Sequence, residues 1–126
     1  FIYQFPWIFV MLVIFIQSSI GRLPLPEIEF ALSDKIAHFI VFGILGILVA
    51  RGFRNSKNNK VKEGYFSLSL IICILYGASD EIHQYFVPGR HASWGDWIAD
   101  VLGIVILIWV YKLLIERKGL VKKETG

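Results

Sequence analysis

Hydrophobic residues in this chain gather into four long runs separated by short polar stretches. The runs cover approximately residues 1–20, 34–53, 65–86 and 94–114. Each is close to the roughly 20 residues that a helix needs to cross the hydrocarbon core of a bilayer. Apolar positions within a run are continuous, whereas strands of a membrane barrel alternate apolar and polar positions. The pattern therefore predicts an all-α integral membrane protein, built as a bundle of four transmembrane helices.

Composition supports a membrane location for this predicted bundle. The chain has 126 residues, of which 56% are hydrophobic, and its mean hydropathy is +0.61. A soluble domain of this size has too high a surface-to-volume ratio to bury that much apolar surface. We expect a single transmembrane domain over residues 1–126. The one cysteine, Cys73, lies inside the third run, so we expect a small core residue without an intramolecular disulfide.

The first run could also be a cleaved signal peptide, and two features favour a retained helix instead. Its start carries no basic residues, and no A-x-A-like cleavage site follows the apolar residues. Secretory signal peptides typically have both a basic start and such a cleavage site. We therefore count this run as the first transmembrane helix.

Basic residues are concentrated in two of the connecting segments. Loop 51–64 carries Arg51, Arg54, Lys57, Lys60 and Lys62, and the tail carries Lys112, Arg117, Lys118, Lys122 and Lys123. Short basic loops stay in the cytoplasm, so both termini are predicted to be cytoplasmic and loops 21–33 and 87–95 to face outward. Neither basic segment has a nucleic-acid-binding motif, which favours contact with anionic lipid headgroups over nucleic acid.

Polar residues concentrate near the predicted outer ends of three runs. They are Asp34 and His38 in the second run, Asp80, Glu81 and Gln84 in the third, and Asp96 and Asp100 in the fourth. At 1.5 Å per residue, the deepest of them lie roughly 6–9 Å inside their helix ends, and each set shares one helix face. Facing lipid would be costly for these groups, so we expect the three faces to meet in a polar pocket open to the outside. Gly77 and Gly103 on these faces would allow close helix packing.

The pocket predicted from these faces is rich in acids. Five carboxylates stand against Lys35, Arg90 and His38, a surplus that calls for protonation of some carboxylates or for a bound cation. His38, Glu81, Asp96 and Asp100 would form an oxygen-rich metal set, although no H-E-x-x-H or cysteine pair supports one. We therefore assign no metal site and no cofactor, and keep a divalent cation as an alternative. His83 is expected to point away from the shared face and His91 to lie in a solvated loop.

Aromatic residues flank the predicted helices at both ends. Tyr85, Phe86, Trp94 and Trp97 are expected to form an outer interfacial belt, and Tyr65, Phe66, Trp109 and Tyr111 an inner one. Pro88-Gly89 predicts a tight turn between the third and fourth helices.

Three stretches of this sequence resemble the VanZ-like membrane protein family. They are FIQSS at 15–19, SDKIAHFIVFGILGIL at 33–48 and SDEIHQYFVPGRHASWGDWIADVLG at 79–103. The positions marked by this resemblance are Ser18, Ser19, Asp34, Lys35, His38, Asp80, Glu81, Gln84, Arg90, Asp96, Asp100 and Gly103. Where many members have asparagine, this chain has Asp100, which makes the pocket more acidic. The family is named for a protein linked to low-level resistance to the glycopeptide teicoplanin. The resemblance thus implies a multi-pass protein of the bacterial cell envelope, and it supplies no reaction.

Three hypotheses for function follow and remain open. In the first, a membrane enzyme acts on an envelope lipid or lipid-linked precursor, with catalytic candidates His38, Glu81, Asp80 and Asp100. Ser18 or Ser19 would be nucleophiles at the mouth, and Lys35 and Arg90 would hold a phosphate or carboxylate of the ligand. The remaining ligand-binding candidates are Asp34, Gln84 and Asp96.

In the second hypothesis, the same residues bind a lipid headgroup or glycopeptide without catalysis. In the third, pairs such as Asp80 with Lys35, or Asp100 with Arg90, only lock the helices together. The number of intramembrane ionisable residues favours a functional role over a purely structural one. A channel or transporter is disfavoured, because the cytoplasmic halves of all four runs are almost purely apolar.

Overall fold

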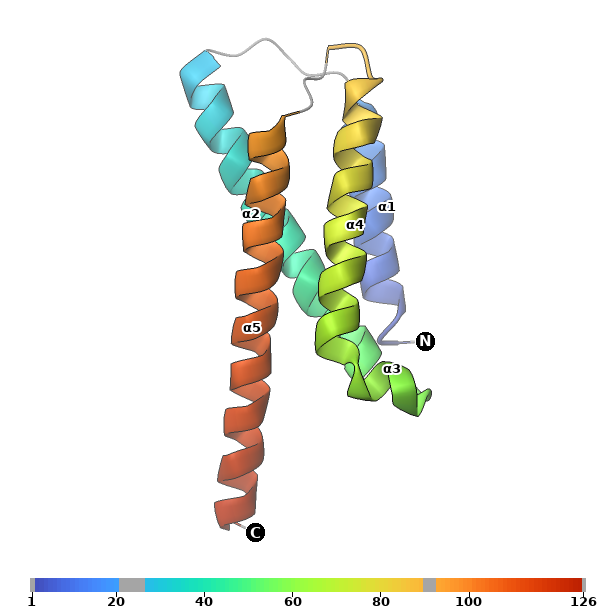
Figure 1. Ribbon diagram of the computed structural model, residues 1–126, viewed down its shortest axis with the longest axis vertical. Helices are drawn as coiled ribbons and strands as arrows, with labels where there is room; N and C mark the ends of the chain where they lie inside the picture. The colour runs from blue at the N-terminus through green and yellow to red at the C-terminus, as the bar shows by residue number, and fades with distance from the viewer. Residues whose placement is uncertain (1, 21–26, 90–92, 126) are drawn as a thin grey trace.

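The computed structural model describes residues 2–20, 27–89 and 93–125, and these residues form helices and no strand. The helices are α1 (Phe5–Ser19), α2 (Glu27–Arg54), α3 (Asn59–Glu63), α4 (Tyr65–Tyr85) and α5 (Trp94–Thr125). α1, α4 and α5 run along the long axis of the molecule, α2 crosses obliquely behind α5, and α3 is a short helix beside the lower end of α4 (Figure 1). The predicted all-α bundle is confirmed.

α1 begins at Phe5 rather than near residue 1, because residues 2–4 form a turn. The boundaries of α2 and α5 differ from the predicted ones because both are helical beyond their apolar parts. α2 begins at Glu27 rather than Asp34, so the prediction of a loop over residues 27–33 was wrong. In the sequence, Pro24 and Pro26 precede this start and no proline follows within the helix. α5 continues to Thr125, eleven residues past the predicted end at 114, because its charged tail consists largely of good helix formers. Hydropathy therefore predicts the apolar part of each of these helices, and the helix itself extends further.

Among the described residues, three helical segments are long and apolar enough to cross a membrane: Asp34–Arg54, Tyr65–Tyr85 and Trp94–Glu124. α1 has 15 residues, a length of about 22 Å, so it is shorter than the other three. Its contacts nevertheless run along most of the bundle: the Gln4 side-chain amide donates to the Gly52 carbonyl over 2.8 Å, and Ser18 donates to Asp80. These apolar helices indicate a multi-pass membrane protein.

The two ends of the bundle differ in character. We call the end formed by Ser18, Asp34, Gln84 and Asp96 the polar end, and the opposite end, with Arg51, Arg54 and α3, the basic end. Both chain termini lie away from the polar end (Figure 1). Gly89, beyond α4 at the polar end, has a φ of 80°, which glycine adopts readily, in agreement with the predicted turn. The side of the membrane that each end faces stays a prediction.

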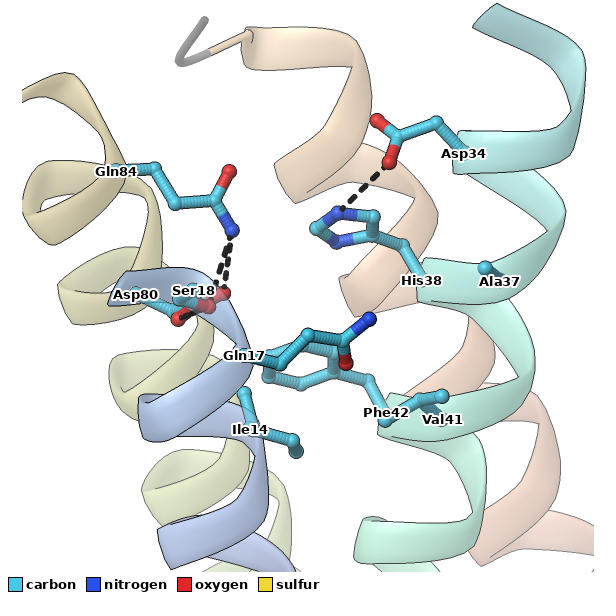
Figure 2. A pocket seen from close by; sticks show the side chains of 10 residues that line it. All are labelled: Ile14, Gln17, Ser18, Asp34, Ala37, His38, Val41, Phe42, Asp80 and Gln84. Atoms are coloured by element: carbon cyan, nitrogen blue, oxygen red, sulfur yellow. Dashed lines mark hydrogen bonds and ion pairs between the residues drawn. The ribbon is translucent and has the colours of Figure 1, made fainter. Parts of the chain in front are cut away.

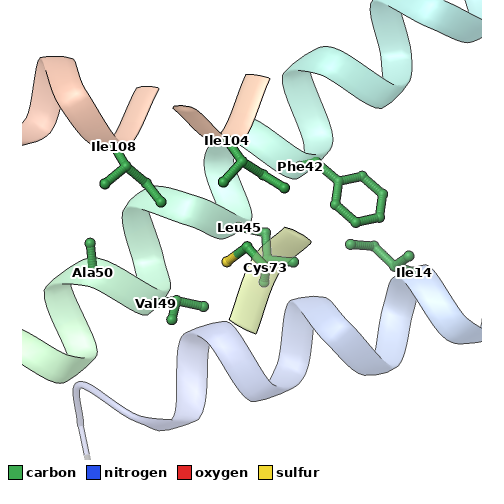
Figure 3. Close-up of a cluster of buried hydrophobic side chains, with 8 residues drawn as sticks. All are labelled: Ile14, Phe42, Leu45, Val49, Ala50, Cys73, Ile104 and Ile108. Atoms are coloured by element: carbon green, nitrogen blue, oxygen red, sulfur yellow. The ribbon is translucent and has the colours of Figure 1, made fainter. Parts of the chain in front are cut away.

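The hydrophobic core lies on the basic-end side of the buried polar residues, and its side chains point toward one another (Figure 3). It consists of Ile14, Phe42, Leu45, Val49, Ala50, Cys73, Ile104 and Ile108. Cys73 is buried and free, as predicted. α2 and α5 contribute most of these residues, so their contact is the main interface of the fold.

Two glycines bring α2 and α5 into close contact just below the polar end. A Cβ on Gly103 would overlap the backbone carbonyl of Phe39, and a Cβ on Gly43 would lie 3.2 Å from the Gly103 carbonyl oxygen. Gly103 thus acts as predicted, allowing helix backbones to touch. Gly77 of α4 faces the Asp100 side chain, and a Cβ there would meet it at 3.4–3.5 Å.

Candidate functional site

Polar side chains from all four long helices meet at the polar end. The buried ones are Ser18, His38, Asp80, Glu81, Gln84, Asp96 and Asp100. The three faces predicted from the sequence therefore do point toward one another, and Ser18 of α1 joins them. Asp34 is partly buried at the top of this group, and Asp100 lies at its base with no exposed surface.

One hydrogen-bond network joins α1 to α4. Ser18 Oγ donates to Asp80 Oδ1, and Gln84 Nε2 donates to Asp80 Oδ2 over 3.0 Å and to Ser18 Oγ over 3.3 Å. Buried polar groups are stable when such partners satisfy them. The network fixes the end of α1 against α4 and holds Asp80 in place.

His38 lies among three carboxylates contributed by three different helices. Its Nδ1 is 2.7 Å from Asp100 Oδ1 and 3.9 Å from Glu81 Oε1, and its Nε2 is 3.7 Å from Asp34 Oδ1. A carboxylate bonded to one ring nitrogen orients the ring and sets which nitrogen carries the proton. Asp100 thus positions an imidazole whose other nitrogen faces Asp34.

The remaining acids have partners that the sequence did not predict. Glu81 Oε2 accepts a hydrogen bond from the Ser93 backbone N–H over 3.1 Å. Lys35 pairs with Asp96, with Nζ 3.7 Å from Oδ1, rather than with Asp80 as suggested in the structural hypothesis. The side chain of Lys35 is 45% exposed. Arg90, the other expected cation and the suggested partner of Asp100, lies outside the described residues.

Several buried oxygens in this group accept no hydrogen bond within the described part of the chain. They are Glu81 Oε1, Gln84 Oε1, Asp96 Oδ1 and Asp100 Oδ2. A buried carboxylate oxygen without a donor is costly. In the part of the chain that the structure describes, two sets of atoms have spacings that suit a metal ion, Asp34–His38–Asp96 and His38–Glu81–Asp100, and they share the imidazole.

A pocket of about 70 Å³ opens between α1, α2 and α4 beside this group (Figure 2). Figure 2 shows a polar upper wall, with Asp34, His38, Asp80 and Gln84, above an apolar floor. The lining residues are Ile14, Gln17, Ser18, Asp34, Ala37, His38, Val41, Phe42, Asp80 and Gln84. Gln17 was not among the predicted site residues, although it is a polar position beside Ser18 at the end of an apolar run.

A second, mostly apolar groove lies on the other side of α4, between α4 and α5. It is lined by Ala78, Glu81, Ile82, Tyr85, Phe86, Ser93, Trp94 and Trp97. The aromatic residues expected to form the outer interfacial belt are therefore also the walls of this groove. Glu81 borders both the groove and the buried polar group.

Ser19 and His83 form a pair outside the pocket. Ser19 Oγ lies 2.8 Å from His83 Nε2 and 2.8 Å from the Phe15 carbonyl oxygen, and the His83 ring stacks on Phe15. His83 points away from the buried acids, in agreement with the sequence analysis. Periodicity did not predict the pairing of His83 with Ser19, because this pairing depends on how α1 lies against α4.

Comparison with known proteins adds one finding. The model of the VanZ/LLP1 family matches residues 3–115, which is most of the chain and includes every site residue described above. No curated protein and no solved structure gives a significant match.

Proposed function

The chain belongs to the VanZ/LLP1 family, and from this membership and the geometry of the polar end we propose a cell-envelope protein that binds a lipid headgroup. The ligand is an envelope lipid or lipid-linked precursor of the outer leaflet, and its headgroup enters the pocket between α1, α2 and α4. The supporting observation is the pocket itself, which combines a polar wall with an apolar floor inside a bundle whose outer surface is apolar.

The chemistry of the lining suggests which headgroups fit best. Its ionisable residues are Asp34, Asp80 and His38, and its neutral polar residues are Ser18, Gln17 and Gln84. Carboxylates accept hydrogen bonds from hydroxyl and ammonium groups, so we propose a headgroup that carries sugar or glycerol hydroxyls or an amine. An anionic group of the same ligand would contact Lys35 or Arg90 rather than the acids.

Orientation in the membrane is part of the proposal. The polar end faces outward, both termini are cytoplasmic, and α1 crosses the membrane together with α2, α4 and α5. Cysteines at Phe86 and Lys118 test this, because both side chains are exposed and Cys73 is buried. An impermeant maleimide added to intact cells should label Phe86→Cys, and should label Lys118→Cys only after permeabilisation. The reverse pattern would place the pocket on the cytoplasmic side.

Headgroup binding is tested by filling the pocket. Ala37 lines it, so Ala37→Phe should displace the lipid that co-purifies with the protein, as measured by native mass spectrometry. Ile40→Phe is the matched control on the same helix, because Ile40 is 49% exposed and does not line the pocket. Equal lipid retention by both variants would contradict the proposal.

The His38–Asp100 pair supports a second candidate, acid–base catalysis on the same headgroup. An imidazole held by a carboxylate is a common general base, and Asp100 lies 2.7 Å from Nδ1. In cells, His38→Gln should then cause one envelope lipid to accumulate while the protein level stays normal. An unchanged lipid profile, together with normal headgroup binding by purified His38→Gln, would favour binding without catalysis.

Teicoplanin resistance remains part of this proposal. Expression of the chain in a susceptible bacterium should raise the teicoplanin concentration needed to stop growth, and Ala37→Phe should abolish the increase. If Ala37→Phe protects as well as Ile40→Phe does, the pocket is not involved in resistance.

A further inference from the structure

The base of the polar group contains three potential metal ligands from three helices. His38 of α2 contributes Nδ1, Glu81 of α4 contributes Oε1, and Asp100 of α5 contributes a carboxylate oxygen. The three donor atoms lie within 4.8 Å of one another. His38 and Asp100 are far apart in sequence and are brought together by the close approach of α2 and α5 at Gly103.

Two unsatisfied oxygens distinguish this set from an ordinary acidic cluster. Glu81 is 8% exposed, and its Oε1 is directed toward His38 Nδ1, 3.9 Å away, without accepting a hydrogen bond from any described residue. Asp100 is fully buried, and its Oδ2 also lacks a donor in the described part of the chain. A well-packed bundle does not leave such atoms without compensation.

The charge around His38 is uneven. On its Nε2 side, the Lys35 ammonium lies 3.7 Å from Asp96 Oδ1 and balances that carboxylate. On the Nδ1 side, the ion pairs of Glu81 and Asp100 within the described residues involve only His38 itself. A divalent cation with a neutral imidazole would balance two carboxylates.

We infer that His38 Nδ1, Glu81 Oε1 and Asp100 bind one divalent transition-metal cation, of which Zn²⁺ and Mn²⁺ suit the donors best. Two carboxylates and one imidazole match the mixed oxygen and nitrogen preference of these ions. Donors around a tetrahedral zinc lie about 3.3 Å apart, given metal–ligand distances of about 2.0–2.2 Å. The His38–Asp100 and His38–Glu81 separations, 2.7 Å and 3.9 Å, fall on either side of that value, and all three donors lie within 4.8 Å of one another. Side-chain shifts of about 1–1.5 Å therefore complete the site.

The imidazole keeps a proton when it binds the cation through Nδ1. That proton resides on Nε2, which faces Asp34 Oδ1 at 3.7 Å. Histidine ligands commonly donate their second ring N–H to a carboxylate in this way. Three protein ligands also leave coordination positions open, as in catalytic zinc sites.

Metal binding is measured on the full chain in lipid nanodiscs, treated with chelator and then titrated with Zn²⁺, Mn²⁺ or Mg²⁺. We expect one equivalent of Zn²⁺ or Mn²⁺ and weaker binding of Mg²⁺. The bound Mn²⁺ should show electron-spin-echo modulation from an imidazole nitrogen. Two results on the wild-type protein would each overturn the inference. One is binding of less than one equivalent of both Zn²⁺ and Mn²⁺, and the other is bound Mn²⁺ without nitrogen modulation.

Variants identify the ligands. Glu81→Gln and Asp100→Asn should each weaken Zn²⁺ binding by at least about 10-fold, because losing a residue that only hydrogen-bonds to a metal ligand can already have an effect of that size. Asp96→Asn is the matched control, because Asp96 belongs to the set on the opposite side of the imidazole. Loss of binding in Asp96→Asn with normal binding in Glu81→Gln would overturn this assignment.

The metal inference does not rest on headgroup binding. Ala37→Phe fills the pocket without removing a proposed ligand, so it should still bind one equivalent of Zn²⁺ even though it loses the lipid. Glu81→Gln should do the reverse: a variant that loses the metal but keeps the lipid would show that headgroup binding does not require the metal.

Discussion

Toward the basic end, the helices pack through aliphatic side chains such as Leu45, Val49 and Ile108, which are fully buried and make no polar contact. At the polar end the same helices meet through Ser18, His38 and Asp100, whose contacts are directional hydrogen bonds and ion pairs. In a bilayer, lipid tails are as apolar as the aliphatic side chains, so packing rather than water exclusion stabilises the first region. The second region adds specificity, because each polar group there needs a particular partner.

The largest effect should come from the contact that separates the two regions. Gly103→Val places side-chain atoms where the Phe39 carbonyl lies, and a backbone cannot move aside as a side chain can. We expect a loss of about 3 kcal/mol or more in the free energy of unfolding, seen as lost folded protein in detergent. Gly119→Ala is the control, since nothing lies within 4 Å of its added Cβ. A stable Gly103→Val variant would show that α2 and α5 do not touch there.

A cavity in the aliphatic region should have the next largest effect. Leu45 is fully buried, so Leu45→Ala should lower the free energy of unfolding by about 2–5 kcal/mol, measured by reversible unfolding in mixed micelles. Its neighbour Ile44 is 47% exposed, and Ile44→Ala should change the same quantity by less than about 0.5 kcal/mol. Equal losses in the two variants would mean that burial does not distinguish these positions.

Removal of the Ser18 hydroxyl from the polar region should cost less. Ser18→Ala deletes the donor to Asp80 and the acceptor for Gln84, while Gln84 still donates to the Asp80 carboxylate, so we expect a loss of about 1–2 kcal/mol. Ser69→Ala is the matched control: Ser69 is also fully buried but donates only to Phe66 of its own helix. If both serine variants lose the same stability, the link between α1 and α4 contributes nothing specific.

The smallest effect is expected outside both regions. Ser19 is exposed and pairs with His83 on the surface of the bundle, so Ser19→Ala should change the free energy of unfolding by less than about 0.5 kcal/mol. Headgroup binding should also remain as in the wild type. A loss of lipid binding in Ser19→Ala with normal stability would extend the site beyond the pocket.

Sequence periodicity was sufficient to predict which helix faces turn inward. It was insufficient to predict which side chains pair between helices. The four-residue spacing of Asp34 and His38, and the shared face of Asp80, Glu81 and Gln84, predicted which side chains turn inward. The pairing of Lys35 with Asp96, and of His38 with Asp100, depends on the crossing angle and register of neighbouring helices. No pattern within one helix encodes those quantities.

Helix ends showed the same division. Tyr65 and Trp94 are starts that polar and turn-forming neighbours predict correctly. Glu27 and Thr125 lie beyond the apolar runs, where helix propensity continues after hydropathy has fallen. Residue types alone likewise suggested that His38 and nearby carboxylates could bind a metal. The unsatisfied oxygen of Glu81, however, follows only from the packed helices.

The contact at Gly103 also makes the α2–α5 crossing a pivot. Asp100 is three residues from Gly103, about 4.5 Å along the axis, whereas Asp96 is about 10 Å away. A small change in the crossing angle therefore moves Asp96 and Asp34 apart by more than twice as much as it moves Asp100 and His38. A change in that angle would therefore widen the mouth of the polar end more than it would separate Asp100 and His38 at its base.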